Sequence, residues 1–188
     1  MISQQYKCIF IHIPKTGGTS IEQKLGLFDE LKRGVQDHRT IHEIKNNLSY
    51  FEFKSYFKFT FVRNPWARIF SWYKNIMRDP IHRSNLKVAE ECSFKDFLKR
   101  HINQHFLNAQ LFWITDKRGK ILVDFIGKFE RLEEDFSHVC DILRIKDKML
   151  PKLLISDDEH YTEKYDDEMK KMVAEKFIKE IQLFGYTF

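Results

Sequence analysis

Phe10-Ile-His-Ile-Pro-Lys-Thr-Gly-Gly-Thr-Ser20 decides the fold, because this stretch joins an apolar run to a loop that suits an anion. Residues 7–13 are rich in β-branched and aromatic side chains, which is typical of a buried strand, and Pro14 ends that strand. Gly17 and Gly18 permit a positive φ and the close approach of a ligand to the backbone. The stretch therefore predicts a strand followed by a phosphate-binding turn.

A helix is predicted directly after this turn. Ile21, Leu25 and Phe28 follow one another at i, i+4 and i+7, so the helix begins near Thr19 and directs its N–H groups and positive dipole end at the loop. Lys15 adds a mobile charge, but it precedes the glycines, whereas the lysine of the pattern G-x-x-x-x-G-K-[ST] follows them. The loop therefore shares the physics of a nucleotide-binding loop and differs in residue order. Its hydroxyl donors are Thr16, Thr19 and Ser20.

A second strand and helix are predicted between residues 56 and 77. Residues 56–62 alternate, so that three phenylalanines share one face of a strand. Asn64 suits an N-cap, and Pro65 suits the first position of a helix. Apolar residues then recur with helical period at Trp66, Ile69, Phe70, Tyr73, Ile76 and Met77.

Arg63 and Ser71 are predicted to bind one anion together. Arg63 follows the second strand, and open α/β sheets bind their ligands at the carboxyl ends of strands. Ser71 falls nearly opposite the centre of the apolar stripe, on a face that Ala67 leaves open. A guanidinium suits a phosphate because it can donate two parallel hydrogen bonds. Two such strand-to-helix junctions indicate a ligand with two well-separated phosphates.

The two motifs resemble the paired signatures of the PAPS-dependent sulfotransferases, in particular the Golgi carbohydrate sulfotransferases and their bacterial relatives. The resemblance is carried by residues 10–22 and 61–73. Residues 123–136 and 184–188 are similar, with less specificity, to the late strand and helix and to the C-terminus of that family. The resemblance implies that the first loop holds the 5'-phosphosulfate of 3'-phosphoadenosine-5'-phosphosulfate (PAPS), and that Arg63 with Ser71 holds its 3'-phosphate.

The reaction implied by this resemblance is transfer of a sulfuryl group from PAPS to a hydroxyl or amine. By analogy alone the acceptor is a carbohydrate. Sulfuryl transfer should have a loose, in-line transition state, so that positioning and charge neutralisation dominate catalysis and no metal is required. Lys15 would neutralise the bridging oxygen, and the backbone N–H groups of residues 17–20 would bind the 5'-phosphate.

A general base must accept the proton of the acceptor, and a neutral histidine suits this role. His38 is the first candidate, because it lies in a polar segment at a place where the family resemblance also puts a histidine. His12 is the alternative, since it lies on the first strand close to the loop, although a strand histidine is often a hydrogen-bonded core residue. Glu22 is the third candidate.

Two other functions fit part of the pattern. A P-loop nucleotide kinase or hydrolase would explain the first loop, but the order of its lysine differs and no aspartate follows a clear apolar strand to hold magnesium. A binding protein that retains the donor site without turnover would have the same two motifs. An activity that depends on magnesium would indicate the kinase or hydrolase. A lack of sulfate transfer from a labelled donor would indicate the binding protein.

The chain as a whole predicts a single sulfotransferase-like domain over residues 1–188. Its 188 residues are 43% hydrophobic and include 18 phenylalanines, which is enough for one core. Strands alternate with helices, so the expected class is α/β, with a P-loop-like parallel sheet flanked by helices on both faces.

Further elements are predicted outside the two motifs. A strand is expected at residues 121–126 after a hairpin turn at residues 117–120, and a helix follows from Leu132. Ser93 resembles the first residue of a capping box and begins another helix. A long helix is predicted over residues 166–184.

Composition argues against several other classes of protein. Cys8, Cys92 and Cys140 are far apart and lack a C-x-x-C spacing, so we interpret them as buried packing residues. The net charge is +5, but basic and acidic residues alternate along the chain, so no nucleic-acid partner is expected. No apolar run approaches ~20 residues and no signal-peptide pattern is present, which predicts a cytoplasmic protein without a membrane span.

Two pairs of histidines have the i, i+4 spacing that can place two metal ligands on one helix. Neither pair belongs to a recognisable metal motif such as H-E-x-x-H. We therefore interpret both as histidines on helix surfaces and predict no metal site. The pairs are His38 with His42 and His101 with His105.

Overall fold

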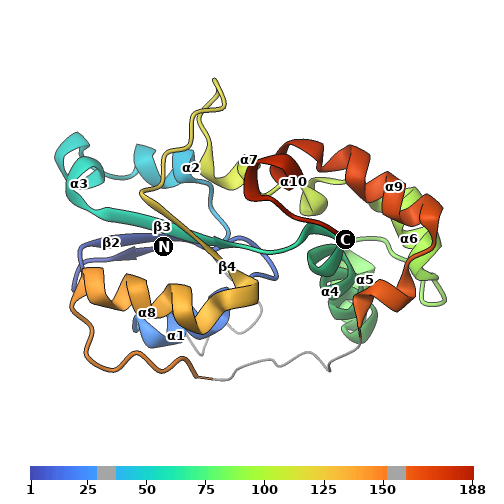
Figure 1. Ribbon diagram of the computed structural model, residues 1–188, viewed down its shortest axis with the longest axis horizontal. Coiled ribbons are helices and arrows are strands. Elements are labelled where there is room, and N and C mark those ends of the chain that lie inside the picture. Colours follow the sequence, from blue (N-terminus) through green and yellow to red (C-terminus); the bar gives the residue numbers. More distant parts are fainter. Residues whose placement is uncertain (29–36, 152–159) are drawn as a thin grey trace. The chain divides into compact units, whose positions relative to one another are not determined.

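The computed structural model describes residues 1–28, 37–151 and 160–188, which form a mixed α/β structure (Figure 1). The described residues group into two units. Unit 1 contains those of Met1–Arg63 and Gln110–Ile155, and unit 2 contains those of Asn64–Ala109 and Ser156–Phe188. The predicted mixture of strands and helices is confirmed.

Unit 1 contains a four-stranded sheet in the order β1, β2, β3, β4. The short strand β1 (Ile2–Ser3) is antiparallel to β2 (Cys8–Ile11). β2, β3 (Phe57–Val62) and β4 (Phe125–Lys128) are parallel to one another. Because β2 and β3 are parallel neighbours, the segments that follow them leave the sheet at the same edge.

The core of unit 1 lies between one face of the sheet and two helices. Phe10 and Phe59 are register partners on β2 and β3, and their ring centroids are 5.1 Å apart. They pack in one cluster with Ile21 of α1 (Gly18–Lys24) and Phe136 of α8 (Leu132–Leu143). In Figure 1, α1 and α8 lie below the sheet, whereas α2 (Ile41–Asn46) and α3 (Tyr50–Ser55) lie above it. The predicted packing of a helix from Leu132 on the last strand is confirmed.

The strand predicted at residues 121–126 begins later in the structure. Ile121 instead forms an antiparallel bridge with Thr115, across the predicted hairpin turn. The carboxylate of Asp116 accepts hydrogen bonds from the backbone of Arg118 at 2.8 Å and of Lys120 at 2.9 Å. These bonds confirm the turn and hold Ile121 in the hairpin, so that the parallel strand β4 starts only at Phe125.

Unit 2 is helical in its described part. Its first helix, α4, begins as predicted, because the Asn64 side chain accepts a hydrogen bond from the backbone of Trp66 at 3.1 Å and Pro65 is the first helical residue. Ser93 caps α6 by accepting a hydrogen bond from the backbone of Asp96 at 3.1 Å. The elements are α4 (Pro65–Arg78), α5 (Pro80–Asn85), α6 (Phe94–His101), η2 (His105–Leu107), η4 (Tyr161–Lys164), α9 (Asp167–Lys176) and α10 (Ile178–Phe184).

The long helix predicted over residues 166–184 is two helices in the structure. The backbone of Phe177 leaves the helical region with φ −111° and ψ 20°, and this residue separates α9 from α10. The side chain of Phe177 is buried in the core of unit 2 with Val173 and Met169. Apolar periodicity continues through the break, which is why the sequence pattern did not show it.

Three other sequence predictions can be compared with the described residues. All three cysteines are buried and free, as predicted. Within residues 1–28, 37–151 and 160–188, no helix is long and apolar enough to cross a membrane, and no group of three or more histidine, cysteine or acidic side chains is arranged to hold a metal. The paired histidines do not share helices, because His38 precedes α2 and His105 lies beyond α6. Their assignment to helices is wrong for His38 alone, since His42 lies on α2, His101 on α6 and His105 on the short helix η2.

Candidate active site

The loop between β2 and α1 contains two residues in the left-handed region. Lys15 has φ 70° and Gly17 has φ 80°, and Gly17 is the N-cap of α1, which begins one residue before the predicted start. Thr16 between them is fully buried, and its hydroxyl donates a hydrogen bond to the carbonyl of Ile13 at 2.8 Å. The hydroxyl of Thr16 therefore fixes the shape of the loop.

The two glycines of the loop have different roles. The sequence permits a positive φ at both glycines, and Gly17 adopts one whereas Gly18 does not. A Cβ atom on Gly18 would lie 2.0 Å from Cδ2 of His12, so Gly18 is required because the histidine ring packs against the first turn of α1. The sequence predicts that a ligand approaches the backbone closely at this glycine. In the structure the group that lies close to Gly18 is the ring of His12.

We expect Gly18→Ala to destabilise unit 1 by about 1–3 kcal/mol or more, because the added methyl group overlaps a buried ring. Urea unfolding followed by circular dichroism would measure this loss. Gly119→Ala is the comparison variant that separates the two costs, because its φ of 80° strains the alanine backbone while a Cβ there meets no described atom within 4 Å. A Gly18→Ala variant as stable as the wild-type protein would contradict the packing role of Gly18.

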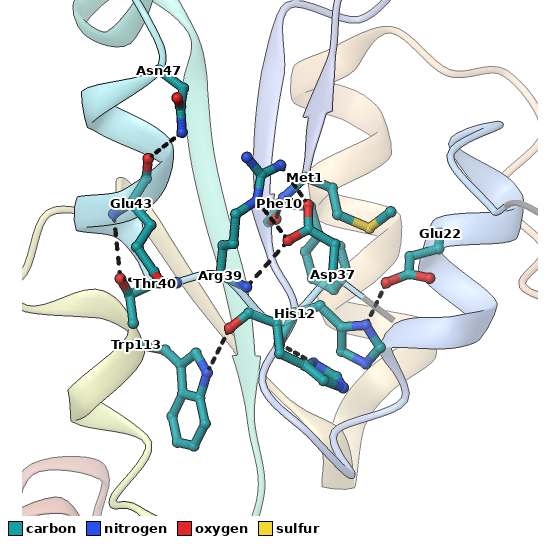
Figure 2. A network of polar contacts seen from close by, with 11 residues as sticks. Met1, Phe10, His12, Glu22, Asp37, Arg39, Thr40, Glu43, Asn47 and Trp113 are labelled. Carbon is teal, nitrogen blue, oxygen red and sulfur yellow. Dashed lines mark hydrogen bonds and ion pairs between the residues drawn. The ribbon is translucent and has the colours of Figure 1, made fainter. Parts of the chain in front are cut away.

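His12 and Glu22 form a buried pair beneath the loop. Each residue is 2% exposed, and the Nδ1 atom of His12 is hydrogen-bonded to the carboxylate of Glu22 (Figure 2). His12 follows β2 directly and Glu22 lies on α1, so this contact joins the end of the strand to the helix across the loop. Two of the three candidate bases are therefore bonded to each other.

The third candidate base, His38, lies against His12. Its Nδ1 atom is 2.8 Å from the carbonyl oxygen of His12 and must donate the hydrogen bond, because a carbonyl can only accept. The bond fixes the neutral tautomer, with the lone pair on Nε2. The two imidazole rings meet edge to face with centroids 4.5 Å apart. This geometry leaves Nε2 of His38 as the unprotonated nitrogen that a general base needs.

Burial lowers the pKa of His38 to about 4. The nearby His12 and, more weakly, Lys15 lower the pKa further, whereas the hydrogen bond to the His12 carbonyl and the charge of Asp37 raise it. His38 is therefore neutral at physiological pH in the free protein. A neutral imidazole can accept a proton, which an imidazolium cannot.

Arg63 contacts the first loop directly. It follows β3, and its Nη1 atom donates a hydrogen bond to the carbonyl of Lys15 at 3.2 Å. The guanidinium lies 4.1 Å from the ring centroid of Phe129, which is a cation–π contact. The structure therefore brings Lys15 and Arg63 together at the carboxyl ends of two neighbouring parallel strands. The sequence placed these residues in two separate phosphate sites.

Ser71 belongs to unit 2, whereas Arg63 belongs to unit 1. Ser71 lies on α4 and is 8% exposed, and Ala67 one turn earlier is 7% exposed. The expectation that Ala67 leaves an open surface is therefore wrong. A shared anion between Arg63 and Ser71 stays a prediction.

Two further residues contact the candidate site and were missed by the sequence analysis. The side-chain amide of Gln110 is hydrogen-bonded to the backbone of Arg63, and the indole of Trp113 is hydrogen-bonded to the carbonyl of His38. The sequence offered one signal, because Gln110 is a polar residue at the start of an apolar segment, Leu111–Ile114. Such a glutamine needs partners if it is buried.

Comparison with known proteins identifies the family. Residues 1–187 match the model of the sulfotransferase family, and the chain therefore belongs to that family. It is 22% identical over 176 residues to mouse carbohydrate sulfotransferase 14, and 24% identical over 236 aligned positions to carbohydrate sulfotransferase 10 of Xenopus laevis. These matches cover 77% and 98% of this chain. The resemblance that was seen in the two motifs is confirmed.

The relatives differ in how much of their own length the chain spans. It covers 46% of the mouse protein and 66% of the Xenopus protein. An uncharacterized protein from Archaeoglobus fulgidus is 28% identical over 118 residues, which are 63% of this chain and 92% of that protein. No solved structure gives a significant match.

Proposed function

We propose that this protein is a PAPS-dependent sulfotransferase that transfers a sulfuryl group to a hydroxyl or amine, with a carbohydrate as the acceptor class. The observation that carries the proposal is the contact between Arg63 and the Lys15 loop, in a chain that belongs to the sulfotransferase family. Two basic residues at neighbouring strand ends suit a donor with several negative charges. The named carbohydrate sulfotransferases among the relatives support the acceptor class.

In this proposal the first loop binds the reactive end of the donor. The backbone N–H groups of residues 17–20 hold the 5'-phosphate, while Thr16 fixes the loop from inside. Arg63 and Ser71 hold the 3'-phosphate. A guanidinium carries several N–H donors in a planar fork, so the hydrogen bond from Arg63 to the Lys15 carbonyl is compatible with binding of a phosphate.

The proposed reaction uses His38 as the base and Lys15 as the neutralising charge. Nε2 of His38 accepts the proton of the acceptor group as its oxygen or nitrogen forms a bond to sulfur. The bond between sulfur and the 5'-phosphate oxygen breaks, and its electron pair leaves with adenosine 3',5'-bisphosphate. Lys15 stabilises the negative charge that develops on this oxygen. His12 and Glu22 support the base, since both are buried and bonded to each other.

Calorimetry with adenosine 3',5'-bisphosphate, AMP and ATP tests the proposal. We expect wild-type protein to bind the bisphosphate more tightly than AMP, because only the bisphosphate carries a 3'-phosphate. Arg63→Ala should weaken bisphosphate binding by about ten- to a hundredfold and leave AMP binding nearly unchanged, since a hydrogen bond to a charged group contributes about 1.5–3 kcal/mol.

The controls separate the proposed function from its alternatives. Arg131→Ala removes an exposed arginine of unit 1 and should leave binding of the bisphosphate unchanged. Transfer of labelled sulfate from PAPS distinguishes an enzyme from a protein that only binds the donor. Indifference of the wild-type protein to the 3'-phosphate would overturn the proposal, and so would a strict magnesium requirement for ATP turnover.

A further inference from the structure

We propose that α7 (Leu111–Ile114), together with the preceding Gln110, is the positioning element of the active site. Gln110 positions Arg63 for the donor, and Trp113 positions His38 for the acceptor. The inference rests on the proposed function, and it assigns two residues that do not themselves touch the donor or the acceptor.

Gln110 holds Arg63 through a reciprocal pair of hydrogen bonds. Its Oε1 atom accepts a bond from the Arg63 backbone N–H at 2.8 Å, and its Nε2 atom donates a bond to the Arg63 carbonyl at 2.8 Å. The side chain thus extends the hydrogen bonding of β3 by one residue beyond Val62. Gln110 is fully buried, so the backbone of Arg63 has a fixed position from which its guanidinium reaches the Lys15 carbonyl.

Trp113 holds the segment that carries His38. Its indole Nε1–H donates a hydrogen bond to the carbonyl of His38 at 3.1 Å, and Trp113 is 4% exposed. The imidazole of the same residue donates to the His12 carbonyl at 2.8 Å. Trp113 therefore holds the backbone of His38, and the carbonyl of His12 holds its ring. Together the two hydrogen bonds restrict the orientation of Nε2.

One helical turn joins these two contacts. Gln110 and Trp113 are three residues apart, and the backbone N–H of Trp113 donates to the carbonyl of Gln110 at 3.2 Å. A hydrogen-bonded turn has little freedom to lengthen. The spacing between Arg63, which follows β3, and His38, which precedes α2, is therefore set by α7. Catalysis by positioning requires such fixed spacing, because small displacements of reacting groups reduce the rate strongly.

Two substitutions that remove side-chain hydrogen bonds test the inference. Trp113→Phe keeps an aromatic ring and removes the indole N–H, and we expect it to lower the turnover number about tenfold while changing the Kd of adenosine 3',5'-bisphosphate less than twofold. Gln110→Met keeps the side-chain length, and we expect it to raise that Kd about tenfold while changing the turnover number at saturating PAPS less than twofold. The assay is transfer of labelled sulfate from PAPS to a panel of desulfated polysaccharides and methyl glycosides.

Matched variants identify a purely structural effect. Trp72→Phe removes an indole N–H that has no hydrogen-bond partner among the described residues, and Gln23→Met removes an exposed amide, so both should retain wild-type turnover and Kd. If Gln110→Met does not fold, Gln110→Glu retains an acceptor for the Arg63 N–H and should still raise the Kd. Parallel losses of turnover and donor binding in both test variants would overturn the inference. A wild-type protein that binds the bisphosphate but transfers no sulfate would instead overturn the proposed function on which it rests.

Discussion

Replacing Lys15 by alanine is expected to lower the turnover number of sulfuryl transfer by about 10²–10³ and to change donor affinity only a few-fold. The reason is that the charge on the oxygen leaving sulfur is small in bound PAPS and large in the transition state. A positive side chain beside that oxygen therefore stabilises the transition state more than the ground state. Turnover measured at saturating PAPS, together with calorimetry of the bisphosphate, gives the two quantities separately.

The conformation of Lys15 supplies matched controls for this experiment. Its φ of 70° is strained for any residue with a Cβ, so alanine and arginine bear the same backbone cost as lysine. Lys15→Arg keeps the charge and should retain more activity than Lys15→Ala. Lys7 is an exposed lysine with φ 48°, and Lys7→Ala should behave as wild type. Equal losses of affinity and turnover in Lys15→Ala would show that Lys15 only binds the donor.

Replacing His38 by asparagine is expected to lower turnover by about 10²–10⁴, the contribution typical of a general base. The asparagine amide can still donate a hydrogen bond to the His12 carbonyl, so the local structure is maintained while the proton acceptor is lost. His138→Asn, which changes an exposed histidine on α8, should have no effect. Full turnover in His38→Asn would show that His38 is not the base and would favour His12, the alternative candidate.

The pH dependence of the wild-type enzyme follows from the same residue. A base must be unprotonated, and burial, together with the nearby His12, lowers the pKa of His38 to about 4. We therefore expect kcat/KM to be constant around neutral pH and to fall only as the pH decreases toward about 4. A decrease centred near 6.5, the usual pKa of histidine, would contradict the assignment of a buried His38 as base.

Stability must be followed in the same titration. The pKa of His38 is lowered on folding, so the unfolded chain binds this proton more tightly than the folded chain. The contribution of neutral His38 to stability is therefore complete above about pH 6.5 and is lost as the pH falls toward 4. Circular dichroism at each pH distinguishes protonation of the base from unfolding.

Local sequence patterns were sufficient where the interactions that form an element are close in sequence. The start of α4 could be predicted because Asn64 and Pro65 contact their own helix, and the turn after Asp116 could be predicted because its hydrogen bonds span four residues. The break at Phe177 and the late start of β4 at Phe125 were missed. Both depend on packing or hairpin contacts that an apolar pattern does not encode.

The amino-acid sequence by itself determined the strand, turn and helix around Lys15, the position of Arg63 after a second strand, and the sulfotransferase family. Only the tertiary structure decided that Arg63 contacts the Lys15 loop, that Gly18 is required by the ring of His12, and that Gln110 and Trp113 hold the site. The physical reason is separation along the chain. The hydrogen bond between Arg63 and Lys15 joins residues that are 48 positions apart, and the bond between Trp113 and His38 joins residues that are 75 positions apart. Parallel strand pairing brings the first pair together, and side-chain hydrogen bonds between distant segments leave no periodic signal in the sequence.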